Sequence, residues 1–222
     1  MNVIPETMKN KTIIGVDEAG RGPLFGSVYT SAIILPNDDF DLSLLKDSKK
    51  FTSKKKIKSV YDYIKESNSI FSIDYSTHEE IDKYNILQAT QKSMHRSVKN
   101  VIDKYINTFE NFTCDIFESI LICVDGNYFN DFFYYYEDEY YRINHECLIK
   151  GDDICKSISG ASILAKVERD LYIDEFIKDN PDYDEKYNLS KNKGYGTKQH
   201  LDGIRIHGYS PYHRKSFKVK SI

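Results

Sequence analysis

Apolar and β-branched residues form three short runs in the first third of the chain. Residues 12–16 and 27–35 are separated by a glycine-rich turn, and residues 70–76 alternate with the two-residue period of a strand. A lysine-rich segment with helical apolar spacing, residues 52–63, lies between the second and third runs. The pattern predicts three strands, with a helix between the second and the third.

Capping residues and one apolar run mark the next elements. Thr77 and Glu80 have the spacing of a capping box, in which each side chain satisfies a backbone N–H of the other residue, so a long helix is expected to begin there. The run ILICV at residues 120–124 is followed by Asp125 and Gly126. An apolar run that ends in a turn signal is typical of a buried central strand.

The last third of the chain has a helical pattern. An apolar stripe at residues 157–178 predicts a long helix. After Pro181 the pattern is that of a loop as far as Thr197, where a short helix is expected to run to His207 and end at Gly208.

The segment between the predicted central strand and that long helix is unusual. Residues 131–142, DFFYYYEDEYYR, contain seven aromatic and four acidic side chains and show no single period. We expect an inserted hairpin or loop. Its acidic side chains would repel a polyanion, so it should project away from any surface that binds one.

Length and composition agree with a single folded unit. The chain has 222 residues, of which 40% are hydrophobic and 29% are charged, which is enough to bury a core and excludes a disordered chain. We expect an α/β fold, with a main domain at residues 1–180 and a mainly helical, basic extension at residues 181–222 packed on it. There is no secretory signal and no run of about 20 apolar residues. An intracellular, cytoplasmic and monomeric protein without a membrane partner is therefore expected.

The charge is unevenly distributed, although the formal net charge is only −3. Residues 186–222 carry nine Lys and Arg against one acid, and residues 46–58 carry seven Lys against one. Two basic clusters on an acidic background favour a protein that binds a polyanion beside an acidic, metal-binding centre. Solvated lysine-rich surface would give the same composition. The four cysteines match no zinc spacing, and we interpret them as buried thiols.

Two adjacent carboxylates, Asp17 and Glu18, end the first strand and are followed by Gly20, Arg21 and Gly22. Unpaired carboxylates beside a core are costly, and a divalent cation is the simplest compensation. Since neighbouring strand residues point to opposite faces, both could reach one metal only if the backbone leaves strand geometry near Glu18. The glycines would let a phosphate or sugar approach the backbone closely. A solvated acidic turn is the alternative.

Two further carboxylates lie at comparable places. Asp125 ends the most apolar strand, and Asp152 follows Lys150 and Gly151 before the long helix. Oxygen ligands of this kind suit Mg²⁺ or Mn²⁺ better than zinc. In a two-metal site one ion activates the attacking water and the other stabilises the leaving oxygen of a phosphodiester. Each Asp taken alone could equally mark a turn.

The chain resembles the type 2 ribonuclease H family, of the ribonuclease HII kind. Six groups of motifs carry the resemblance in matching order: VDEAGRGP, DSKK, NILQAT, VDGN, KGD with SISGASILAKVERD, and NKGYGT with PYHRKSF. The resemblance implies a ribonuclease H-like fold, a mixed sheet flanked by helices, with Asp17, Glu18, Asp125 and Asp152 as catalytic and metal-ligating residues. The distance to the following helix favours Asp152 over Asp153.

The same resemblance implies roles in substrate binding. Gly20, Arg21 and Gly22 would sense the ribose 2′-OH, and Tyr195 would pack on the following deoxyribose. Lys49 and Lys166 fall on family positions near the phosphates. Taken alone, Lys49 and Lys166 could equally be solvated surface residues. Tyr195 is one of 18 tyrosines and could equally belong to the surface or the core.

The implied activity is that of an endoribonuclease with Mg²⁺ or Mn²⁺, two ions taking part. It would cut the RNA strand of RNA–DNA hybrids, cut 5′ of single ribonucleotides in DNA, and leave 3′-OH and 5′-phosphate ends. Gly160 departs from the usual alanine of the family, and no sliding-clamp motif is seen near the C-terminus. A different nuclease or integrase on the same fold, and a catalytically silent nucleic-acid-binding protein, are the rival hypotheses.

Overall fold

A six-stranded sheet with the order β3-β2-β1-β4-β6-β5 forms the centre of the molecule. The computed structural model describes residues 8–37 and 40–219. The strands are β1 (Thr12–Ala19), β2 (Val28–Ile34), β3 (Ile70–Ser76), β4 (Ile120–Asp125), β5 (Phe132–Tyr136) and β6 (Glu139–Leu148).

The sheet is mixed. β1, β2 and β3 pair antiparallel, whereas β4 pairs parallel with both β1 and β6, and β5 closes the edge antiparallel to β6. The register of the parallel pair sets Val16 opposite Val124. Asp17 and Asp125 each follow that pair directly, so two acids lie at the same edge of the sheet.

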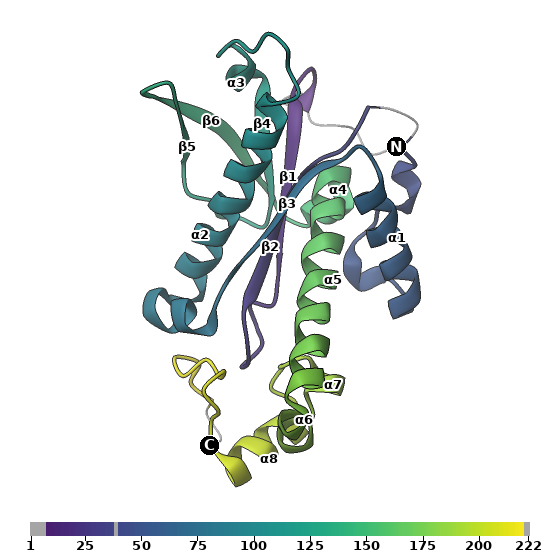
Figure 1. Ribbon diagram of the computed structural model, residues 1–222, viewed down its shortest axis with the longest axis vertical. Helices are drawn as coiled ribbons and strands as arrows, with labels where there is room; N and C mark the ends of the chain where they lie inside the picture. The colour runs from purple at the N-terminus through teal and green to yellow at the C-terminus, as the bar shows by residue number, and fades with distance from the viewer. Residues whose placement is uncertain (1–7, 38–39, 220–222) are drawn as a thin grey trace.

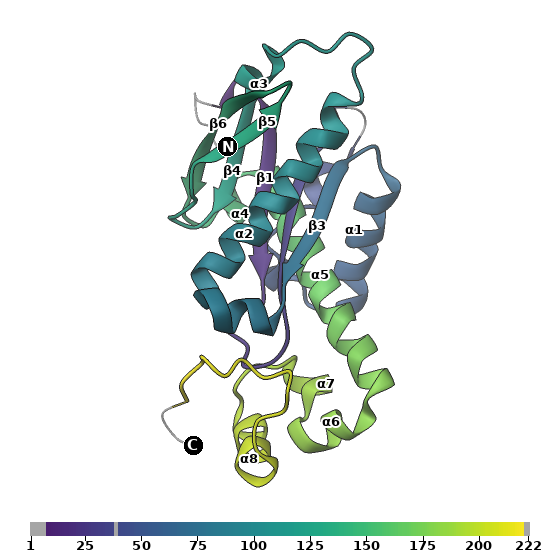
Figure 2. The ribbon, with the colours of Figure 1, turned by 60° about the vertical axis from the view of Figure 1, so that its left-hand side comes forward.

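Helices cover both faces of the sheet (Figures 1 and 2). The long helix α2 packs on β1, β2 and β3, and α5 packs on β1 and β2 with α1 beside it. The α-helices are α1 (Lys54–Glu66), α2 (His78–Ile106), α3 (Ile116–Ser119), α4 (Gly151–Ile154), α5 (Lys156–Asp179), α6 (Pro181–Tyr187), α7 (Leu189–Asn192) and α8 (Lys198–His207). The short 3₁₀ helices η2 (Leu42–Leu44) and η3 (Ser48–Lys50) lie between β2 and α1.

α5 lies unusually close to the centre of the sheet. Gly15 of β1 faces its first turn, where an added Cβ would come 2.1 Å from the carbonyl carbon of Ser157. Only glycine permits this approach, because any side chain would push the helix away from the strand. The close packing brings Asp152, which lies in the short helix α4 just before α5, toward the acidic edge of the sheet.

The C-terminal helices α6, α7 and α8 gather at one end of the molecule, below the sheet in Figure 1. Their apolar side chains Tyr187, Leu189 and Ile204 pack with Phe25 and with Ile173 of α5. None of the helices in the described part of the chain has the length and apolar character needed to cross a membrane.

Most of the predicted elements are confirmed. The three early strands, the lysine-rich helix, the long helix with its capping box and the central strand are all present. The prediction of a loop from Pro181 to Thr197 was wrong, because α6 and α7 lie there. These helices are only seven and four residues long, too short to show a clear apolar period.

The tyrosine-rich segment is a hairpin, as predicted, and it forms part of the central sheet. β6 pairs with β4 and extends the sheet. The side chains of Phe132, Tyr134 and Ile143 are buried in the same cluster as the central strands. The exposed aromatic residues Phe133, Tyr135 and Tyr140 belong to the other side of the hairpin. The hairpin thus contributes side chains to the core cluster that packs around the central strands.

Candidate active site

Four carboxylates converge from three separate parts of the fold. Asp17 and Glu18 belong to β1, Asp125 is the last residue of β4, and Asp152 belongs to α4. Asp125 accepts a hydrogen bond of 2.8 Å from the backbone N–H of Gly151, which ties β4 to the start of α4. The carboxylate oxygen of Asp17 accepts one of 2.6 Å from the N–H of Glu18.

Regular strand geometry ends just after Glu18, at the glycines that the sequence offers there. β1 continues to Ala19, and Glu18 still pairs with Thr30 of β2. The break comes at Gly20, whose φ of +95° favours glycine. Glu18 and Asp17 nevertheless line one cavity, because both lie at the end of the strand.

Burial, together with neighbouring charges, raises the pKa of three of these acids. Burial, then the charges of Glu18 and Asp125, raise the pKa of Asp17 well above its usual range. Burial also raises the pKa of Glu18, although the Arg21 guanidinium opposes it. For Asp152, burial and the neighbouring carboxylates of Asp47 and Asp125 raise the pKa. A nearby cation would relieve this repulsion.

A cavity of about 240 Å³ brings most of the predicted site residues together. It is lined by three of the carboxylates and by all the residues predicted to bind substrate: Asp17, Glu18, Asp125, Gly20, Arg21, Gly22, Lys49, Lys166 and Tyr195. Asp152 does not line this cavity, and it is connected to the site through its interaction with Asp125. The prediction that these side chains gather at one place therefore agrees with the fold.

The loop at Gly20, Arg21 and Gly22 fits tightly over buried side chains. A Cβ on Gly20 would come 2.0 Å from Nε of Arg169, and one on Gly22 would come 3.4 Å from the Tyr195 ring. Arg21 lies 3.4 Å from Glu18 in an ion pair. A side chain at Gly20 would therefore collide with the buried Arg169, whereas one at Gly22 would make ordinary contact with Tyr195.

Tyr195 is supported from behind by a buried pair of histidines. Its backbone carbonyl lies 2.9 Å from Nδ1 of His200, and Nε2 of His200 lies 3.0 Å from Nε2 of His213. Burial lowers the pKa of both rings, that of His213 to about 3, which favours a hydrogen bond between neutral imidazoles in which one Nε2 donates and the other accepts. The Tyr195 side chain itself is 47% exposed and faces the cavity.

The two predicted lysines differ in their surroundings. Lys166 forms an ion pair of 2.6 Å with Asp170 on the same helix. Burial acts to lower the pKa of Lys49, but the nearby carboxylates, Asp47 first and Asp17 next, outweigh it and raise the pKa. Lys49 is therefore charged and lies beside the acids.

Sequence reasoning missed three residues of the site. Asp47 caps η3 by accepting a hydrogen bond from the Lys49 N–H, and it borders Asp152. Arg169 and Arg214 are almost fully buried beneath the glycine loop. All three fall inside the recognised motifs, and a charged residue within an apolar helix, such as Arg169, was the available signal.

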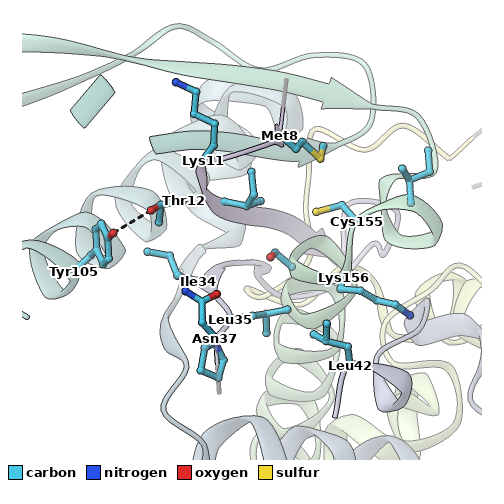
Figure 3. A pocket seen from close by; sticks show the side chains of 14 residues that line it. Met8, Lys11, Thr12, Ile34, Leu35, Asn37, Leu42, Tyr105, Cys155 and Lys156 are labelled. Atoms are coloured by element: carbon cyan, nitrogen blue, oxygen red, sulfur yellow. Dashed lines mark hydrogen bonds between the residues drawn. The ribbon is translucent and has the colours of Figure 1, made fainter. Parts of the chain in front are cut away.

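A second, larger cavity lies elsewhere. It measures about 430 Å³ and contains none of the predicted site residues. Its lining includes Met8, Leu42, Tyr105, Cys155 and Lys156 (Figure 3).

All four cysteines are free thiols, as predicted. Cys123 and Cys155 are buried, whereas Cys114 and Cys147 are partly exposed, so the prediction of buried thiols is confirmed for two of the four.

The described side chains do not surround an ion as they stand. Within residues 8–37 and 40–219, no three His, Cys, Asp or Glu side chains are arranged to hold one metal. The donor set nevertheless fits a hard divalent cation, since it consists of carboxylate oxygens, and the pKa values of Asp17, Glu18 and Asp152 are raised. Ligation would require the acids to turn toward one another.

Comparison with known proteins agrees with this geometry. A family model for ribonuclease HII matches residues 14–220. The chain belongs to the ribonuclease HII family. It is thus a type 2 ribonuclease H, an endoribonuclease that acts on RNA–DNA hybrids. The ribonuclease HII of Treponema denticola is 40% identical over 210 residues, which cover 95% of this chain and 100% of the relative.

Solved structures of related enzymes share the fold. The structure of the PCNA:RNase HII complex from Archaeoglobus fulgidus matches with a TM-score of 0.65 at 17% identity, covering 95% of this chain and 97% of that one. Bst-RNase HIII in complex with Mn²⁺ matches with a TM-score of 0.56 at 17% identity, covering 90% of this chain and 64% of that one. The expected ribonuclease H-like fold is confirmed.

Proposed function

We propose that this ribonuclease HII family member cuts 5′ of single ribonucleotides embedded in duplex DNA, as well as RNA–DNA hybrids, with two divalent ions. The observation that carries the proposal is the shared cavity, which joins carboxylates, a glycine loop and an exposed aromatic ring. A nuclease that ignored the sugar would need the acids but neither the loop nor Tyr195.

Asp17, Glu18, Asp125 and Asp152 are the residues that would hold the ions. Mg²⁺ or Mn²⁺ would supply an activated water and charge stabilisation at the leaving oxygen. The proposal is supported by the raised pKa values of Asp17, Glu18 and Asp152 and by the Mn²⁺ in the related Bst-RNase HIII. Hydrolysis in this way would leave 3′-OH and 5′-phosphate ends.

The remaining residues of the cavity would select and orient the substrate. Backbone groups of the loop from Gly20 to Gly22 can approach the ribose closely, since no side chain intervenes at either glycine. Tyr195 offers its ring to the following sugar, and Lys49 and Lys166 carry charges suited to phosphates. Only the 2′-OH distinguishes the ribonucleotide, so its contacts decide where the strand is cut.

The test is a cleavage assay on a DNA duplex with one ribonucleotide, labelled at the 5′ end, in Mg²⁺. We expect one product that ends in a 3′-OH immediately before the ribonucleotide, and no product from the all-DNA duplex. Cleavage of a continuous hybrid without any cut at the single ribonucleotide would refute the proposed specificity. Equal cleavage of the all-DNA duplex would refute sugar recognition altogether.

A further inference from the structure

Two arginines are buried beneath the glycine loop without an acidic partner. Arg169 is 1% exposed and Arg214 is fully buried. Among the residues that the structure describes, no Asp or Glu oxygen lies within ion-pair distance of either guanidinium. Buried charges of this kind are costly unless other groups solvate them, so such residues need an explanation.

Backbone carbonyls take the place of the missing carboxylates. Arg214 donates to the carbonyls of Gly20 at 2.7 Å, Arg21 at 3.0 Å and Gly26 at 2.8 Å. Arg169 donates to the carbonyl of Lys193 at 3.0 Å and, at longer range, to those of Phe25 and Ser27. Arg214 thus holds two successive peptide groups of the loop in the fixed geometry of its fork.

The direction of these contacts determines where the loop offers its donors. In a planar trans peptide the N–H points opposite to the C=O. Since the carbonyls of Gly20 and Arg21 face Arg214, the N–H groups of Arg21 and Gly22 are directed away from it. The charge of the guanidinium also polarises both peptides, which makes these N–H groups stronger donors.

The segment that carries Arg214 is itself fixed at both ends. The backbone N–H of Arg214 donates a hydrogen bond of 2.8 Å to the carbonyl of Leu24. Just beyond it, Asp82 on the first turns of α2 accepts hydrogen bonds from the N–H groups of Lys215 at 2.9 Å and Ser216 at 2.8 Å, and from the Ser216 hydroxyl. The loop is therefore connected through Arg214 to a helix on the far side of the segment.

We infer that Arg214 is a positioning residue for sugar recognition, which holds the loop so that the N–H groups of Arg21 and Gly22 reach the ribose 2′-OH or the adjacent phosphate. The inference rests on the proposed function. Arg214 does not contact the substrate; it acts through the two carbonyls. Asp82 supports the same arrangement from outside the cavity.

The preference for a ribonucleotide over DNA provides the test. Affinities are measured in Ca²⁺ for two duplexes that differ only by one 2′-OH, and their ratio is the readout. A general loss of folded protein lowers both affinities together and leaves the ratio unchanged. Arg214→Lys retains the charge but loses the fork, so we expect the ratio to fall by about tenfold, the equivalent of one or two hydrogen bonds.

Lys215→Ala is the matched control. It removes a charge from the neighbouring exposed position without touching the loop, so both affinities can fall but their ratio should stay that of the wild type. Asp82→Asn weakens the anchor of the segment and should lower the ratio by a smaller factor. This variant carries the test if Arg214→Lys does not fold.

A wild-type ratio in both Arg214→Lys and Asp82→Asn would overturn the inference. A wild-type protein that binds the two duplexes equally would instead refute the proposed function. The two failures are thus distinguishable. A reduced ratio in Lys215→Ala as large as that in Arg214→Lys would also overturn the inference, because it would assign the effect to charge alone.

Discussion

Replacement of Gly20 by alanine tests how tightly the recognition loop is built. Gly20 has a φ of +95°, and an added Cβ would come 2.0 Å from Nε and 2.3 Å from Cδ of Arg169. Arg169 cannot simply turn away, because it is buried and donates to three backbone carbonyls. The substitution therefore combines backbone strain with overpacking.

The two costs can be estimated separately. A non-glycine residue at such a φ costs about 1–3 kcal/mol, and overpacking a buried site adds about 1–3 kcal/mol. Gly126 is the matched control, since its φ is +108° but nothing lies within 4 Å of its added Cβ. Gly20→Ala should thus be less stable than Gly126→Ala by about 1–3 kcal/mol, the overpacking cost alone.

Thermal unfolding of the metal-free proteins measures the difference. At about 2–4 °C per kcal/mol for a chain of this size, Gly20→Ala should unfold about 2–12 °C below Gly126→Ala. Cleavage by Gly20→Ala should fall by about a hundredfold, because a loop displaced by roughly 1 Å misplaces the sugar. Equal unfolding temperatures for the two variants would refute the packing of Arg169 against Gly20.

Three further changes test other parts of the account. Tyr195→Ala should lower kcat/KM for a single embedded ribonucleotide by about fivefold to a hundredfold, because an aromatic contact is worth roughly 1–3 kcal/mol. Cleavage of a continuous hybrid should fall less, and equal losses on the two substrates would assign Tyr195 to general binding. Gly160→Ala should stabilise the protein by about 1 kcal/mol in urea unfolding, because the new Cβ would lie 3.6 Å from Ile33 in ordinary contact; a loss of stability would show that α5 has no space there. Asp17→Asn should stabilise the metal-free protein at neutral pH, since the raised pKa of Asp17 means that its ionised form opposes folding. That gain should shrink as the pH falls from the raised pKa of the folded protein toward the ordinary value of 3.8, below which Asp17 is protonated in both the folded and the unfolded state. A gain that grows on acidification would contradict this prediction.

Local patterns predicted the parts of the site that depend on local structure. Strand periodicity placed Asp17 and Asp125 at strand ends, and the parallel pairing of β1 with β4 brings those ends together. The glycines after Glu18 indicated a sharp turn, and Gly20 has the positive φ that such a turn requires. The predictable residues of the site therefore lie mostly at the ends of strands and in the turns that follow them.

Long-range contacts could not be predicted in the same way. Arg214 reaches Gly20 across 194 positions of the chain, and Asp82 reaches Ser216 across 134. No periodicity connects such residues, because the packing of α2 and the C-terminal segment decides which charged group meets which carbonyl. The sequence predicted an inserted hairpin or loop at residues 131–142 but not its place in the sheet, since the pairing of β6 with β4 is a tertiary contact.

Asp125→Asn tests directly whether the carboxylates act through bound metal. Asparagine has the shape of aspartate but lacks its charge, so we expect the variant to have lost cleavage of an RNA–DNA hybrid in Mg²⁺. Binding of the same hybrid should be unchanged or slightly tighter, because less negative charge faces the phosphates. Turnover near that of the wild type in Asp125→Asn, with binding intact, would contradict the assignment of the metal site.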